Sequence, residues 1–165
     1  MMKAIVRVVL AAVVAVAATA CHTIDDDLVP PAQVNISFTT EAQWTIYGAP
    51  AAMDCKTFIF TSTERVPAGF PYMASSATGF AGVMLVGDVN GTPRAFDLAC
   101  PVDPKRNVRL FINDNHEAQC PVCGSRYDVF SLEGYPVGGP AADKGYGLRQ
   151  YRVARGRVDF MLVSY

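Results

Sequence analysis

Short runs of alternating or β-branched residues, separated by turn-forming residues, constrain the fold of this chain more than any other feature. Apolar and polar side chains alternate over residues 34–38, and residues 57–60 and 83–86 are rich in β-branched and apolar side chains. Residues 88–91 read Asp-Val-Asn-Gly, and the Asn-Gly pair strongly favours a hairpin. After residue 32, no stretch of ten or more residues shows helical periodicity without a glycine or a proline. The pattern predicts an all-β fold of antiparallel strands, as a sandwich or a barrel.

The folded body is expected to span residues 33–165 as one β domain. Its last two β-forming segments flank Arg155-Gly156, which predicts a terminal hairpin. The other segments expected to be extended are those with β-branched or aromatic side chains: Trp44, Ile46 and residues 108–112, 151–153 and 158–163.

The first twenty residues have the pattern of a secretory signal peptide. Lys3 and Arg7 form a short positive region, and residues 8–18 form an apolar run that is short for a membrane span. Residues 18–20 read Ala-Thr-Ala and precede Cys21, which resembles a bacterial lipobox in which the cysteine is lipidated after cleavage. The alternative is an ordinary signal peptide with Cys21 merely nearby. The lipobox interpretation predicts a protein anchored by lipid to the outer membrane of a Gram-negative cell envelope.

Residues 21–32 are expected to form a lipidated acidic tether outside the folded domain. The three adjacent acids at residues 25–27 repel one another and favour solvent, and Pro30-Pro31 stiffens the exit from the segment. The acidic stretch either resembles a surface-export signal of Gram-negative lipoproteins or is a plain soluble spacer, and both interpretations stay open.

The charge balance bears on the partners of the protein. The formal net charge is −1, and removal of Lys3 and Arg7 with the leader makes it −3. A domain without a basic excess argues against nucleic acid as a partner. The sequence therefore indicates one partner, the membrane, reached through the lipid anchor, and it names no protein partner.

Two cysteine motifs carry the only candidate chemistry. They read Cys-Pro-Val-Asp at residues 100–103 and Cys-Pro-Val-Cys at residues 120–123. A Cys-x-x-Cys pair directs two sulfurs to one point, and Gly124 permits the backbone turn that such a knuckle needs. Together the motifs offer three sulfurs and one carboxylate to a tetrahedral metal ion. These candidate ligands are Cys100, Asp103, Cys120 and Cys123.

The second motif and its neighbours resemble the Rieske domain family. Residues 120–128, Cys-Pro-Val-Cys-Gly-Ser-Arg-Tyr-Asp, are similar to the second cluster loop of the family, and residues 134–141 resemble the loop that covers the cluster. Residues 95–101 resemble the strand entering the first loop, and residues 148–153 resemble the strand that closes the sheet. The resemblance covers about half of the chain, from Gly79 onward. It implies an antiparallel Rieske-like β fold with a small two-loop knuckle subdomain.

The resemblance does not extend to the histidine ligands of a Rieske centre. Such a centre has two histidines on one of its irons. Val102 and Cys123 stand at the two histidine positions, and the histidines of the chain, His22 and His116, stand elsewhere. We therefore expect a Rieske-like fold without the standard cluster. Where a cluster is present, the resemblance assigns two further residues to cofactor binding: Ser125 and Tyr127.

The role of the cysteines stays open among several alternatives. An exported protein meets an oxidising compartment, so a disulfide among Cys100, Cys120 and Cys123 without metal is the first interpretation. A zinc site with Asp103 comes second, and an atypical iron–sulfur centre that uses Cys55 or Asp103 as its fourth ligand comes third. Free thiols remain as the last alternative. We expect either no cofactor or zinc ahead of a [2Fe–2S] cluster.

Other residue types do not form a catalytic set. Asp97, Asp128 and Arg126 are potential acid–base groups, but the sequence shows no base or nucleophile paired with them. We therefore expect a non-enzymatic envelope lipoprotein. The alternatives are an electron-transfer protein with an atypical iron–sulfur centre and a zinc-stapled binding module.

Overall fold

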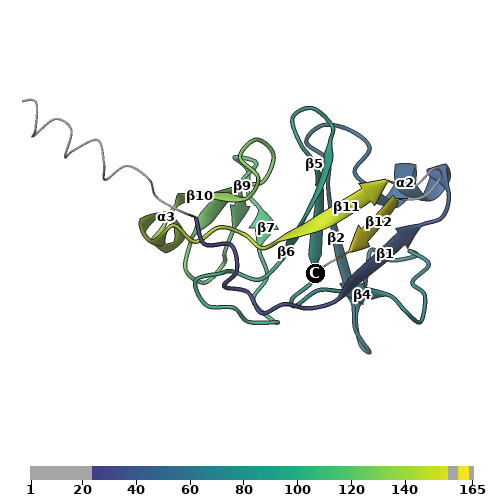
Figure 1. Cartoon of the computed structure of the whole chain (residues 1–165), viewed down its shortest axis with the longest axis horizontal. Helices are drawn as coiled ribbons and strands as arrows, with labels where there is room; N and C mark the ends of the chain where they lie inside the picture. Colours follow the sequence, from purple (N-terminus) through teal and green to yellow (C-terminus); the bar gives the residue numbers. More distant parts are fainter. Residues whose placement is uncertain (1–23, 156–159, 164–165) are drawn as a thin grey trace, which may run out of the picture.

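The computed structural model describes residues 24–155 and 160–163, and these are mostly antiparallel β structure (Figure 1). Among the described helices, none is long or apolar enough to cross a membrane. The helices are α2 (Glu41–Tyr47) and α3 (Pro140–Lys144). The strands are β1 (Val34–Phe38), β2 (Cys55–Phe60), β3 (Arg65–Val66), β4 (Ala77–Thr78), β5 (Val83–Gly87), β6 (Pro93–Asp97), β7 (Phe111–Ile112), β8 (Ala118–Gln119), β9 (Arg126–Asp128), β10 (Tyr135–Gly138), β11 (Gln150–Arg155) and β12 (Phe160–Val163).

The strands form two sheets. The larger sheet has eight strands in the order β3-β2-β5-β6-β11-β12-β1-β4, and the smaller has four in the order β10-β9-β8-β7. Figure 1 shows the smaller sheet and α3 at one end of the long axis of the molecule and α2 at the other end. Within the described residues the sheets form no closed barrel. The predicted antiparallel β architecture is therefore present. The described strands do not form the barrel that was one of its two expected forms.

Strand β5 is buried on both faces because it separates two cores. Val83 and Leu85 belong to the core that also contains Phe38 of β1, whereas Met84 and Val86 belong to a second core shared with the smaller sheet. Successive side chains of a strand point to opposite faces, so each core receives alternate residues. This two-sided burial explains why residues 83–86 are uninterrupted apolar residues rather than an alternating pattern.

Trp44 and Ile46, which were expected to be extended, lie in α2, so this expectation is wrong. The Thr40 side chain accepts a hydrogen bond from the Gln43 N–H (3.1 Å) and caps the start of the helix. Trp44 packs edge-on against Phe38 at 5.1 Å between ring centroids. A cap and one aromatic anchor thus outweigh the β propensity of the two side chains.

The predicted hairpins are present. The side chain of Asp88 accepts hydrogen bonds from the N–H groups of Asn90 and Thr92 and closes the turn between β5 and β6. Strands β11 and β12 pair as the terminal hairpin, and residues 156–159 between them lie outside the described residues. Residues 108–112 contribute only β7 and an isolated bridge between Ala99 and Arg109.

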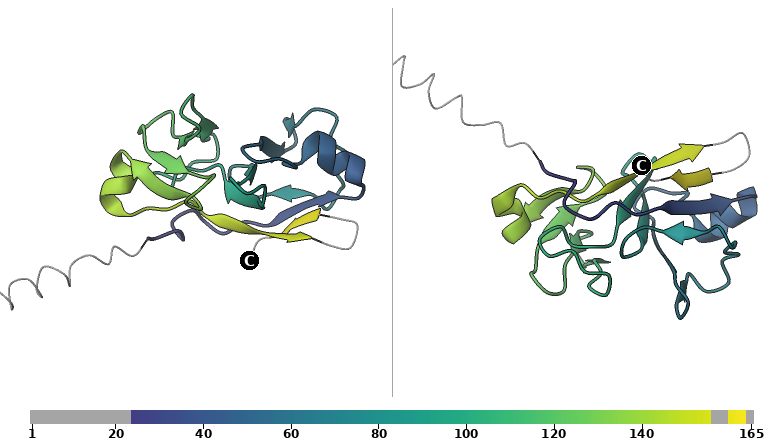
Figure 2. Two further views of the ribbon diagram at one scale, coloured as in Figure 1. Left: turned by 90° about the horizontal axis from the view of Figure 1, so that it is seen from above. Right: turned by 60° about the horizontal axis from the view of Figure 1, so that its bottom comes forward.

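Residues 24–31, here called the strap, pack along the domain. Figure 2 shows the strap running from the α3 end of the molecule to β1. Asp25 forms a parallel bridge with Tyr146, and Val29 is fully buried in the second core. Arg149 donates from Nε to the Val29 carbonyl (2.6 Å) and from Nη2 to the Asp27 carbonyl (3.0 Å).

For residues 24–31, the structure therefore corrects the expectation that the segment 21–32 lies outside the folded domain. The acidic side chains at residues 25–27 are exposed, as their mutual repulsion favours, but the backbone of the strap is bound. The cause is Arg149, which lies more than a hundred residues later in the chain and satisfies two carbonyls of the strap. Cys21 and the leader lie outside the described residues.

We predict that Arg149→Met lowers the free energy of unfolding by about 2 kcal/mol, because the carbonyl of buried Val29 and the exposed carbonyl of Asp27 lose a charged donor. Arg152→Met is the matched control, since Arg152 lies in β11, three residues after Arg149, with an exposed side chain and should change stability little. Urea unfolding of the two variants measures the difference. Equal stability of both variants would show that the contacts between Arg149 and the strap do not contribute to folding stability.

Candidate metal centre

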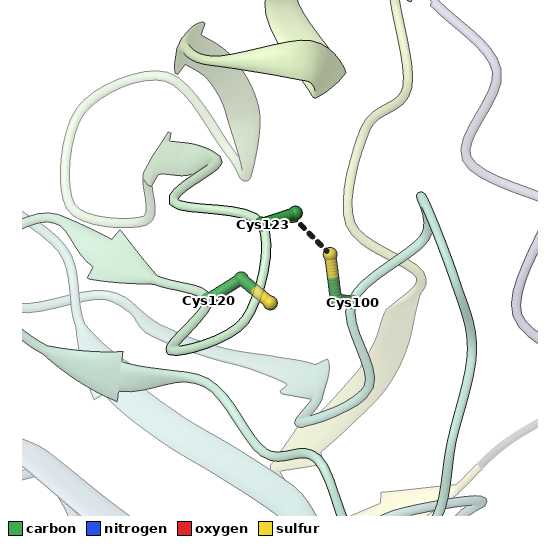
Figure 3. A group of neighbouring side chains, drawn as sticks. All are labelled: Cys100, Cys120 and Cys123. Carbon is green, nitrogen blue, oxygen red and sulfur yellow. Dashed lines mark hydrogen bonds between the residues drawn. The ribbon is translucent and has the colours of Figure 1, made fainter.

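Three cysteine side chains from two loops meet at one point (Figure 3). Cys100 follows the end of β6, and Cys120 and Cys123 lie in the loop between β8 and β9. Their sulfur atoms all lie within 4.8 Å of one another, and the Cys100 and Cys123 sulfurs are 3.5 Å apart. Cys100 and Cys120 are buried, and Cys123 is half-buried. The arrangement places three potential thiolate ligands around one position.

The knuckle between Cys120 and Cys123 is held by its own backbone. The Cys120 N–H donates to the Ser125 carbonyl (2.9 Å), and the Gly124 N–H donates to the Cys120 carbonyl (3.1 Å). Gly124 has φ +71°, a left-handed conformation that glycine adopts without strain. The sequence prediction of a glycine-supported knuckle is confirmed.

The loop that carries Cys100 is fixed by the buried carboxylate of Asp97. This carboxylate accepts hydrogen bonds from the Ala99 N–H (2.8 Å), the Phe80 N–H (2.7 Å) and the Tyr151 hydroxyl (2.6 Å). Asp97 is therefore occupied in structural contacts. The hydrogen bond from the Ala99 N–H to the Asp97 carboxylate is a local pattern typical of aspartate. An aspartate at the end of a strand is therefore the sequence signal for such a structural contact.

Two buried hydroxyls lie against the cysteine sulfurs. The Ser125 Oγ is 3.1 Å from the Cys123 sulfur and accepts a hydrogen bond from the Ala141 N–H of α3 (3.1 Å). The Tyr127 hydroxyl is 3.5 Å from the Cys100 sulfur. The Cys123 thiol donates to the Ser125 Oγ, and when Cys123 is a thiolate the Ser125 hydroxyl can donate its proton to the sulfur instead. Ser125 and Tyr127, the two residues that the resemblance suggests, thus each lie against one of the cysteine sulfurs.

The surroundings give the thiols different acidities. Burial raises the pKa of the Cys100 thiol to about 12, so this thiol is protonated at neutral pH without metal. Burial also acts to raise the pKa of Cys123, but hydrogen bonds from Ser125, Cys100 and Cys120 outweigh it and hold that pKa below its usual range. Burial and the neighbouring Cys100 raise the pKa of Tyr127, which stays a phenol able to donate to sulfur.

The three sulfurs suit one thiophilic ion. Zinc–sulfur bonds of about 2.3 Å at tetrahedral angles place the sulfurs roughly 3.8 Å apart, close to the separation of Cys100 and Cys123. The structure does not bring Asp103 to the sulfurs, because its exposed carboxylate pairs with the Lys105 ammonium at 2.5 Å. The structure thus does not bring the Asp103 carboxylate together with the three sulfurs, and a tetrahedral ion at the sulfurs would need another fourth ligand.

A Rieske [2Fe–2S] cluster does not fit these residues. The cluster needs four protein ligands, two of them histidines, whereas the described residues offer three cysteines at this point. Val102 packs against the second core, and His116 lies in the turn between β7 and β8. Neither residue supplies the missing ligands.

The remaining candidates lie in structural contacts. Cys55 lies in β2 outside the group of three thiols, and burial raises the pKa of its thiol to about 11. The Asp128 carboxylate accepts a hydrogen bond from the Phe130 N–H (3.0 Å), and Arg126 pairs with Glu117 at 3.1 Å. These contacts give Asp128 and Arg126 a structural role.

Comparisons of the chain with protein-family models, with curated proteins and with solved structures find no match. The function is therefore argued from the thiol site and from the N-terminal sequence pattern.

We predict an order of alkylation for the metal-free, reduced protein at neutral pH. Cys123 should react with iodoacetamide well before Cys100 and Cys120, because it is the more accessible thiol and its pKa is lowered. Mass spectrometry of peptides from a time course measures the order. Ser125→Ala should slow the labelling of Cys123 by removing a donor to its thiolate, and faster labelling of Cys120 than of Cys123 would contradict the geometry.

Proposed function

We propose that this protein is an exported, lipid-anchored envelope protein with a non-enzymatic role, in which Cys100, Cys120 and Cys123 hold one metal ion. The observation that carries the proposal is the meeting of three sulfurs, from two loops, within 4.8 Å. Zinc suits the site best, because it accepts three thiolates and one exogenous ligand in tetrahedral geometry. When bound, the ion would tie the loop after β6 to the β8–β9 loop and supply folding free energy.

The proposal includes a Rieske-like arrangement of the two loops without the standard cluster. The packing of the segment that ends β10 supports this arrangement. A Cβ at Gly139 would lie 2.9 Å from the Ser125 Cα, so only a glycine lets this segment cover the knuckle so closely. The Ala141 N–H then reaches the Ser125 hydroxyl. These contacts agree with the family resemblance of residues 134–141.

A disulfide between Cys100 and Cys123 is the second candidate for the site. The distance of 3.5 Å between their sulfurs favours this pair over the other pairings. A disulfide uses only two of the three thiols, however, and leaves Cys120 as a buried thiol beside it. The presence of a third sulfur at the same point is the reason that a metal ion is the better interpretation.

The location of the protein is proposed from its N-terminal pattern. A short positive region, an apolar run and small residues before Cys21 support cleavage and lipidation at this cysteine. Several buried acyl chains hold a protein on a bilayer effectively permanently, since each methylene contributes about 0.8 kcal/mol. The proposed site is the outer membrane of a Gram-negative envelope, with the domain on the periplasmic or the outer face.

We predict one zinc ion per chain in protein purified from membranes without chelator, measured by elemental analysis. Cys100→Ser, Cys120→Ser and Cys123→Ser should each lose most of the metal, whereas the control Asp103→Asn should keep it. A strong chelator should lower the melting temperature of the wild type, and a mild reductant should change it little. A protein without metal whose melting temperature falls only with reductant would instead contain the disulfide.

A further inference from the structure

The strap joins the domain at one defined end of the molecule. The Asp25 N–H donates to the Gly145 carbonyl (2.9 Å), and the Gly147 N–H donates to the Asp25 carbonyl (2.8 Å). A Cβ on Gly147 would lie 2.6 Å from the Ile24 side chain, so the two residues are in close contact. The described chain therefore begins against the residues that follow α3, at the end opposite α2 (Figure 1).

The chain between the proposed lipid anchor and this end is very short. Three peptide steps separate Cys21 from Ile24, and they reach at most about 11 Å. A tether of eleven or more free residues, as the sequence suggested, would let the domain rotate away from its anchor. A strap bound as far as Asp25 removes that freedom.

We propose that the end of the domain formed by Ile24, α3 and Tyr135 faces the lipid bilayer, held there by the bound strap. This proposal rests on lipidation of Cys21, which belongs to the proposed function. Tyr135 belongs to this end because the Gly134 carbonyl before it accepts the Leu148 N–H (3.1 Å), next to Gly147. The bilayer is the occupant because the anchor leaves no room for another large partner between this end and the lipid.

The membrane-facing end includes the neighbourhood of the thiol site. The first turn of α3 contacts the site through the Ala141 N–H and the Ser125 hydroxyl. The residue that ends α3, Gly145, binds the strap through Asp25. One helix of five residues thus links the cysteine knuckle to the anchored end, so exchange of the metal ion would take place close to the membrane surface.

Charge does not hold this end against lipid. The exposed charged side chains of the strap and α3 are Asp25, Asp26, Asp27, Asp143 and Lys144, an acidic majority even with Asp27 paired to Arg149. The orientation must therefore come from the covalent anchor and the strap rather than from attraction to anionic lipid, and it should be insensitive to salt.

The single tryptophan of the chain permits a direct test by energy transfer. Trp44 lies in α2 at the far end of the molecule, and Tyr135 lies at the near end with a 45% exposed side chain. The lipidated full chain is reconstituted in phosphatidylcholine vesicles that contain a small fraction of dansyl-labelled lipid. Transfer to dansyl is compared between the wild type and the double variant Trp44→Phe, Tyr135→Trp.

We expect stronger transfer from the tryptophan at position 135 than from Trp44, at low and at high salt. Insertion of about ten Gly and Ser residues between Thr23 and Ile24 should reduce the difference, because such a linker spans roughly 17 Å on average and frees the domain. Equal transfer from the two positions, or stronger transfer from Trp44, would overturn the orientation. Vesicle flotation with Cys21→Ala as control separates the two proposals, because a wild-type protein that fails to float overturns the anchor and the orientation together.

Discussion

The buried carboxylate of Asp97 is the contact on which the rest of the structure depends. It stands at the end of β6 and accepts hydrogen bonds from the segment before β5, from the loop that carries Cys100 and from the Tyr151 hydroxyl of β11. Three parts of the chain that are distant in sequence are thereby fixed at one point. Gly79 lies so close that a Cβ there would stand 2.7 Å from the carboxylate. With its donors in place, this buried carboxylate is satisfied, and without them it would carry a large desolvation cost.

Two sets of hydrogen bonds position the thiol site: those of the Asp97 carboxylate and those of the cysteine knuckle. Asp97 sets where the chain leaves β6 and so where Cys100 lies, and the hydrogen bonds around Gly124 set the knuckle of Cys120 and Cys123. The smaller sheet, which shares a core with the inner face of β5, brings the two loops together. Ser125 and Tyr127 then present hydroxyls to the sulfurs, an environment that favours thiolates once a cation replaces the protons.

Features with local causes could be predicted from the sequence. The strand at residues 34–38, the Asn-Gly hairpin and the cysteine knuckle depend on neighbours within a few residues, and all three are present. The acidic, proline-containing sequence of residues 21–32 predicts a free tether, but Arg149, more than a hundred residues away, binds two carbonyls of the strap. The likeness of the two motifs predicts Asp103 as a ligand, but the spacing of the motifs does not show that Asp103 pairs with Lys105 at the exposed surface.

X-ray absorption at the zinc edge, on protein purified from membranes without chelator, tests the three-thiolate centre most directly. We expect a first shell of three sulfur atoms at about 2.3 Å and one lighter atom, as Cys100, Cys120, Cys123 and one exogenous ligand would give. The Asp103→Asn variant should give the same spectrum, because its carboxylate lies outside the site. A shell made only of nitrogen and oxygen, or one with a single sulfur, would contradict the assignment of the three thiols to one metal ion.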